Sequence, residues 1–123
     1  MLLDSNIVIY AVKPEYPEVR AFIKQHDATA SILTRIETLG YHDLSSEEAF
    51  KLNRLFDLLG TQPITESIVT RSVTLRQRRK GLTTIDAVIA ATALQRDIPL
   101  ATHDIDDFRW ITELDLVDPL PQP

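Results

Sequence analysis

The segment from residue 83 to residue 94, TTIDAVIAATAL, constrains the fold more than any other part of the sequence. It contains one ionisable group, Asp86, and a helix built from the residues after it would carry apolar or small side chains on every face. Such a helix has no polar face to turn toward water, so other elements must enclose it. We therefore expect a buried helix whose single carboxylate lies buried, or on the floor of a cleft, at its head.

Short apolar segments and amphipathic segments alternate along the rest of the chain. Strands are predicted at residues 1–3, 28–33, 61–65, 98–102 and 114–119. Helices are predicted at residues 5–12, 16–27, 34–42, 45–60, 66–80 and from residue 83 onward, with a turn or short helix at 103–110. This alternation is typical of an α/β fold with a central parallel β-sheet and helices on both faces. No linker or internal repeat is visible, so we predict one domain over residues 1–123, with a frayed tail at 119–123.

The composition limits the compartment and the class of protein. The sequence has no cysteine, which excludes disulfides and thiolate zinc sites and is compatible with a reducing cytosol. No apolar run approaches the roughly 20 residues that a membrane helix needs. The first ten residues also lack the basic region of a signal peptide. We expect a cytoplasmic protein with no membrane partner.

Four acidic side chains follow predicted strands or begin predicted helices. Asp4 follows the first strand, Glu37 lies about one helical turn after the second, and Asp104 follows the strand at 98–102. Asp86 heads the buried helix. Ligands of open parallel sheets bind beyond the carboxyl ends of the strands. If these carboxylates converge there, one must stay protonated unless a cation such as Mg²⁺ or Mn²⁺ neutralises them. One or two such ions are the usual equipment of metal-dependent phosphodiester hydrolysis.

Helix capping and solvation offer another interpretation of each acid taken alone. Asp4 can cap the helix that follows it, and the acids near residue 104 can belong to a solvated turn. Two pairs have the capping-box spacing, Thr34-x-x-Glu37 and Thr83-x-x-Asp86. Burial favours the functional interpretation for Asp4 and Asp86, because a buried carboxylate needs a partner and the neighbouring sequence offers acids rather than Lys or Arg.

Four motifs occur in order over nearly the whole chain, namely LLDSN, TRIETLGY, DAVIAATAL and THDIDDF. With these motifs the sequence resembles the PIN-domain ribonucleases, and among them the VapC-type toxins of toxin–antitoxin pairs. The resemblance implies a PIN-like fold and a metal-dependent endoribonuclease that hydrolyses RNA phosphodiester bonds with Mg²⁺ or Mn²⁺. It also implies a cognate antitoxin protein as a partner, and a homodimer. A non-catalytic PIN-like protein-binding module is the alternative, although such a module would tend to lose the acids that are all present here.

Carried over position by position, the resemblance implies a set of catalytic acids, which are Asp4, Glu37, Asp86 and Asp104. Metal binding is assigned to Asp4, Asp86 and Asp104. Asp107 is a second candidate for the role of Asp104, because three acids lie within four residues of THDIDDF, and Asp106 is expected to point to solvent. The polar positions that would orient the carboxylates or a bound water are Ser5, Asn6 and Thr102.

The charge of the chain is unevenly distributed. The formal net charge of −5 argues against a nucleic-acid partner, but residues 71–80, RSVTLRQRRK, carry five positive charges and no negative one. This run leads through Gly81 to Asp86. We predict that its end contacts RNA phosphates or the antitoxin, through Arg76, Arg78, Arg79 and Lys80. A solvated helix end, favoured by the helix dipole, explains the same residues equally well.

Overall fold

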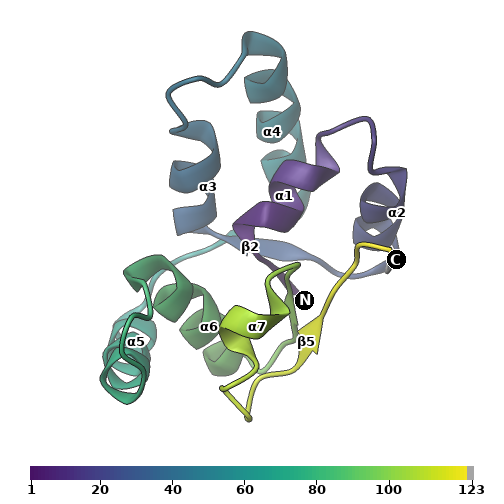
Figure 1. The fold of residues 1–123 in the computed structure, drawn as a ribbon. Coiled ribbons are helices and arrows are strands. Elements are labelled where there is room, and N and C mark those ends of the chain that lie inside the picture. Colours follow the sequence, from purple (N-terminus) through teal and green to yellow (C-terminus); the bar gives the residue numbers. More distant parts are fainter. Residues whose placement is uncertain (122–123) are drawn as a thin grey trace.

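A five-stranded parallel sheet lies at the centre of the computed structural model, which describes residues 1–121 (Figure 1). The strands are β1 (Leu2–Leu3), β2 (Thr29–Ser31), β3 (Thr61–Gln62), β4 (Leu100–Ala101) and β5 (Leu116–Val117). Their order is β3-β2-β1-β4-β5, and every neighbouring pair is parallel. The chain therefore adds strands on one side of β1 first and on the other side afterwards. The predicted α/β class and parallel sheet are confirmed.

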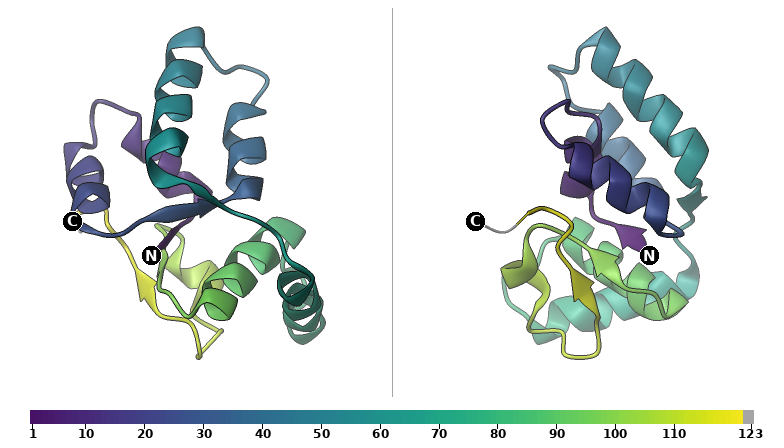
Figure 2. Two further views of the ribbon diagram at one scale, coloured as in Figure 1. Left: turned by 180° about the vertical axis from the view of Figure 1, so that it is seen from behind. Right: turned by 90° about the vertical axis from the view of Figure 1, so that its right-hand side faces the viewer.

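Helices cover both faces of this sheet, as predicted (Figures 1 and 2). One group consists of α1 (Ser5–Ala11), α2 (Pro17–Gln25), α3 (Ile32–Leu39) and α4 (Ser46–Leu59). The other consists of α5 (Glu66–Arg78), α6 (Thr84–Arg96) and the short α7 (Ile105–Phe108). Successive strand residues point to opposite faces, so each strand contributes to two cores. Leu2 packs with α5 and α6, whereas Leu3, the next residue, packs with α1 and α4.

Helix α6 is enclosed as its sequence predicts. All seven residues from Ala87 to Ala93 are buried. Thr83 caps the helix, because its hydroxyl oxygen accepts a hydrogen bond from the backbone N–H of Asp86 at 3.1 Å. Packing on all sides therefore fixes the direction of the helix and holds its first turn, with Asp86, at the carboxyl edge of the sheet.

The boundary between the second strand and the next helix differs from the prediction. The strand ends at Ser31 and α3 begins at Ile32, two residues before the predicted start at Thr34. The reason is a helix cap, in which Ser31 Oγ accepts the N–H of Leu33 at 3.1 Å. The predicted capping box of Thr34 and Glu37 is therefore wrong. Both residues lie inside the helix, and Thr34 is fully buried.

The end of the chain is ordered further than predicted. Leu120 is only 8% exposed and packs into the core beneath α1 and α4, so the described part of the expected tail is not frayed. Residues 122 and 123 of that tail lie outside the described residues. Within residues 1–121, no helix is both long and apolar enough to cross a membrane.

Candidate active site

Asp4 lies at the centre of the carboxyl edge of the sheet. Its backbone N–H donates to the carbonyl of Ala101 at 2.8 Å, which fixes it between β1 and β4. Its Oδ1 accepts the N–H of Ser5 at 2.8 Å, and its Oδ2 accepts the hydroxyl of Thr102 at 2.8 Å. Asp4 is thus the N-cap of α1, but it is also 7% exposed and stands where the strand order reverses between β1 and β4. That reversal is where α/β sheets bind ligands.

The surroundings of Asp4 favour its neutral form in the absence of a cation. Burial raises its pKa to about 6, and the hydrogen bonds from Thr102 and Ser5 offset only part of this effect. The negative charges of Asp86 and Asp104 raise the pKa further. A carboxylate buried among other carboxylates is the arrangement that a bound divalent cation would stabilise.

Thr102 and Asn6 join Asp104 to Asp4. The hydroxyl of Thr102 donates to Asp4 and accepts the backbone N–H of Asp104 at 3.0 Å, so one side chain holds both acids. Asn6 donates through Nδ2 to Asp104 Oδ2 at 3.0 Å. Its amide oxygen is buried and has no hydrogen-bond partner among the residues that the structure describes. A buried acceptor of this kind needs a donor, and a water held beside the carboxylates would supply one.

Asp86 approaches the same edge from the head of α6. Its pKa is raised, first by burial and next by the charge of Asp107, with smaller contributions from Glu37 and Asp104. Hydrogen bonding with the Thr83 side chain lowers it. Asp86 and Asp107 also line a common cavity of about 310 Å³. Asp107 is therefore a neighbour of Asp86, whereas Asp104 is tied through Thr102 and Asn6 to the side of Asp4.

A hydroxyl pair connects α1 to the helix that carries Glu37. Ser5 Oγ donates to Thr34 Oγ1 at 3.2 Å, and both side chains are buried. Glu37 follows one turn after Thr34 and is exposed, yet its charge reaches Asp86. From sequence, Thr34 is predicted only as a helix cap. The i,i+3 spacing of Thr34 and Glu37 within one helix is the signal that would have placed both on the face toward the site.

The remaining predicted residues lie around this cluster. Asp106 points to solvent, as expected, with a side chain that is 87% exposed and paired with Arg109. Arg76 donates through Nε to the carbonyl of Leu82 at 3.0 Å, so it holds the turn after α5. Arg78 pairs with Glu113 at 3.4 Å. Arg79 and Lys80 line the same cavity as Asp86.

The donor set fits a hard divalent cation. Carboxylate, amide and hydroxyl oxygens are the ligands that Mg²⁺ and Mn²⁺ prefer, and the cluster has a surplus of negative charge. In residues 1–121 no three acidic or histidine side chains are already close enough together to enclose an ion. The charges of Asp86 and Asp104 nevertheless reach Asp4. Metal binding would therefore require the exposed carboxylates to rotate toward the buried Asp4 and the half-buried Asp86.

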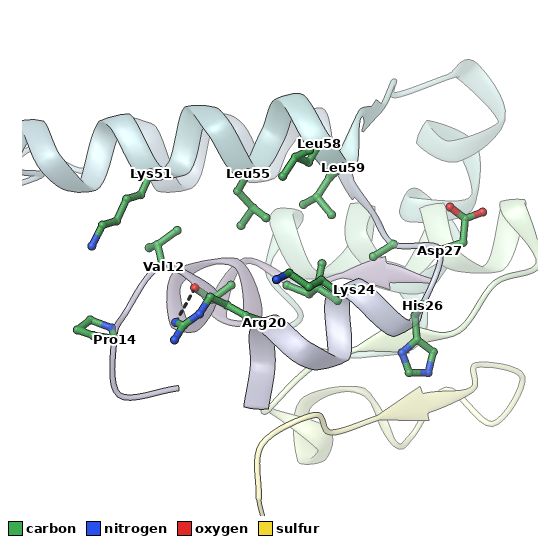
Figure 3. A pocket seen from close by; sticks show the side chains of 13 residues that line it. Val12, Pro14, Arg20, Lys24, His26, Asp27, Lys51, Leu55, Leu58 and Leu59 are labelled. Atoms are coloured by element: carbon green, nitrogen blue, oxygen red, sulfur yellow. Dashed lines mark hydrogen bonds between the residues drawn. The ribbon is translucent and has the colours of Figure 1, made fainter. Parts of the chain in front are cut away.

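A second hollow of about 610 Å³ lies between α2 and α4 (Figure 3). Leucine side chains of α4 face it from one side, and α2 forms the other side. Leu58 of this group is 84% exposed. Lys24 and Lys51 lie along the hollow, while Arg20 is held by the carbonyls of Ala11 and Lys13 at 3.3 and 2.7 Å. The result is an open apolar groove whose border carries Lys24, Lys51 and Asp27, with Lys51 paired to Glu47 at 3.3 Å.

Comparison with known proteins gives one family and several solved structures. The sequence model of the PIN domain family matches residues 1–114. A toxin–antitoxin complex from Klebsiella pneumoniae contains a similar chain, with 27% identity, a TM-score of 0.75 and 97% of each chain covered. VapBC2 from Rickettsia felis, bound to a DNA fragment from its promoter, is 20% identical with a TM-score of 0.83 and covers 94% of this chain and 96% of its own. DNA-bound VapBC from Salmonella typhimurium is 20% identical, with a TM-score of 0.81 and 97% of each chain covered. No curated protein sequence matches.

Proposed function

Because the chain belongs to the PIN domain family, we propose that it is a metal-dependent endoribonuclease and the toxin of a VapBC-type toxin–antitoxin pair. The observation that carries this proposal is the placement of Asp4, which is buried where the strand order reverses and is within reach of the charges of Asp86 and Asp104. The similar toxin–antitoxin structures cover nearly the full length of this chain, which supports the toxin assignment.

Each side chain of the cluster has a defined task in this proposal. Asp4, Asp86 and Asp104 would hold the Mg²⁺ or Mn²⁺, and Glu37 and Asp107 would add negative charge beside them. When bound, the ion lowers the pKa of a water and offsets charge on the phosphate. Thr102 and the Ser5 N–H fix both oxygens of Asp4, so its orientation survives the loss of its proton. The orphaned amide oxygen of Asn6 would accept a hydrogen bond from a water at the site.

Metal dependence provides the direct test of the activity. Cleavage of a labelled single-stranded RNA is expected with Mg²⁺ or Mn²⁺ and is expected to fall to background in EDTA, because four to five carboxylates otherwise repel the phosphate. Excess Mn²⁺ should restore it. A gel-based time course of wild-type protein measures the effect. Equal cleavage in EDTA would reject the metal-dependent mechanism. Absence of cleavage in either ion would favour the alternative, a non-catalytic protein-binding module.

The antitoxin of the proposed pair would bind the groove between α2 and α4. Leu55 and Leu58 offer apolar contacts, and Lys24 at the border favours an acidic residue on the partner (Figure 3). An amphipathic helix with an acidic flank combines the two properties. The homodimer implied by the resemblance stays a prediction.

Truncation of the groove is expected to weaken this complex. Leu58→Ala removes an exposed leucine from the wall of the groove and should raise the Kd for the antitoxin about tenfold. The partner to use is the small protein with a DNA-binding N-terminal half that we expect in the adjacent reading frame. Phe50→Ala is the matched control, because Phe50 lies on the same helix and is 63% exposed. Equal affinities of both variants, measured by calorimetry, would place the antitoxin elsewhere.

A further inference from the structure

The cavity beside Asp86 combines acidic, basic and aromatic side chains. Its volume of about 310 Å³ lies within the range of small-ligand sites, roughly 300–1,000 Å³. Asp86, Asp106 and Asp107 contribute negative charge to the lining, and Arg79 and Lys80 contribute positive charge. Trp110 supplies an aromatic wall. The proposed hydrolytic chemistry explains the acids but assigns no role to Trp110.

Trp110 is held in place on several sides. Its indole Nε1 donates to the carbonyl oxygen of Asp107 at 3.1 Å, which fixes the ring relative to α7. The guanidinium carbons of Arg78 and Arg79 each lie 5.5 Å from the centre of the ring. Arg78 is anchored in turn by Glu113. The ring and the guanidinium groups of Arg78 and Arg79 therefore form one connected group beside α7.

Two cations that line the cavity, Arg79 and Lys80, have their charge available for a ligand. Within residues 1–121, neither Arg79 nor Lys80 forms an ion pair, and both are exposed. Together with an aromatic face, such cations are the elements by which proteins hold unpaired nucleic acid, with phosphate on the basic groups and a base on the ring. A base within a duplex is already stacked on both sides, so only an unpaired nucleotide can offer a free face.

We propose that this cavity binds one nucleotide of single-stranded RNA next to the scissile bond, with its phosphate on Arg79 and Lys80 and its base against Trp110. The inference rests on the proposed ribonuclease function and deepens it by assigning Trp110, Arg79 and Lys80 to a nucleotide subsite beside Asp86. Because Asp86 lines the same cavity, the bound nucleotide would adjoin the proposed metal site.

Intrinsic fluorescence tests this contact without relying on catalysis, because Trp110 is the single tryptophan of the chain. Wild-type protein is titrated with a fluorescein-labelled single-stranded RNA in Ca²⁺, and a gel confirms that the RNA stays intact. Anisotropy of the label reports total binding, while tryptophan emission reports the stacking. We expect both signals to saturate at the same RNA concentration, and a duplex of the same sequence to leave the emission of Trp110 unchanged.

Variants separate stacking from charge. Trp110→Ala should raise the Kd for single-stranded RNA about tenfold, and Trp110→Phe, which keeps an aromatic face, should stay within about threefold of wild type. Arg79→Ala should lower the slope of log Kd against log salt by about 0.7, the value for one lost phosphate contact on a single strand. Arg71→Ala, an exposed cation of α5 that does not line the cavity, should leave the slope unchanged.

Three results would overturn the inference. If RNA binds and is cleaved in Mn²⁺ but neither Trp110 emission nor the Trp110→Ala affinity changes, the subsite is wrong and the proposed function stands. If tetra-arginine quenches Trp110 and RNA does not, the cavity belongs to a protein segment instead. If wild type neither binds nor cleaves RNA, the proposed function fails together with the inference.

Discussion

Asp86→Asn is expected to reduce the rate of RNA cleavage by about 100-fold or more, without loss of the fold. The substitution keeps the shape of the side chain and removes the charge that would hold the metal ion. Capping of α6 survives, because Thr83 accepts a hydrogen bond from the backbone N–H of residue 86, which Asn also has. The buried run that follows is unchanged. A lower cleavage rate would therefore reflect the loss of metal binding and not the loss of the fold.

The control for this variant is Asp106→Asn. Asp106 lines the same cavity as Asp86, but its side chain is 87% exposed and paired with Arg109, so its replacement should change the rate by less than about twofold. Initial rates at saturating Mn²⁺, with circular dichroism of each variant, provide the measurement. If Asp86→Asn cleaves RNA as fast as Asp106→Asn, Asp86 does not hold the metal and the proposed mechanism fails.

Local patterns in the sequence predict the acids that directly follow a strand or begin a helix. Asp4 follows an apolar strand and Asp86 heads a helix that is apolar on every face, so their positions were visible without tertiary information. For Asp4 the capping interpretation and the functional interpretation are compatible, whereas α6 is capped by Thr83 and the Asp86 carboxylate does not complete a capping box. Asp4 accepts the N–H of Ser5 while its other oxygen faces Thr102 across the sheet.

These local patterns do not predict contacts between segments that are distant in the sequence. Thr102 and Asp4 are 98 residues apart, and only strand pairing of β1 with β4 brings them together. The same limit applies to Trp110, whose partners Arg78 and Arg79 come from the end of α5. The cap at Ser31 is hard to predict for a different reason. A β-branched and apolar run can continue a strand or begin a helix, and the capping residue decides where the helix starts.

Asp4→Asn is expected to make the metal-free protein more stable than wild type at pH 8. The pKa of Asp4 is raised from 3.8 to about 6 in the folded state, so folding favours its protonated form. The protein therefore loses stability as the pH rises from below 4 to above 6, and the linked free energy is about 3 kcal/mol. Asn stays neutral over this range and can still accept the N–H of Ser5. The hydrogen bond with Thr102 is partly lost in this variant. We therefore expect the free energy of unfolding at pH 8 to rise by about 2 kcal/mol relative to wild type.

Urea unfolding in EDTA, followed by Trp110 emission, measures the difference at pH 8 and at pH 4. Near pH 4 the advantage of Asp4→Asn should shrink toward zero or reverse, since Asp4 is largely protonated in the folded protein there. In Mn²⁺ at pH 8, wild type should become more stable than Asp4→Asn. A ligand that binds only the native state stabilises it, and Asp4→Asn has lost the carboxylate charge that would bind the ion. If Asp4→Asn is no more stable than wild type in EDTA at pH 8, burial does not penalise the charge of Asp4. If Mn²⁺ stabilises both proteins equally, Asp4 is not among the metal ligands.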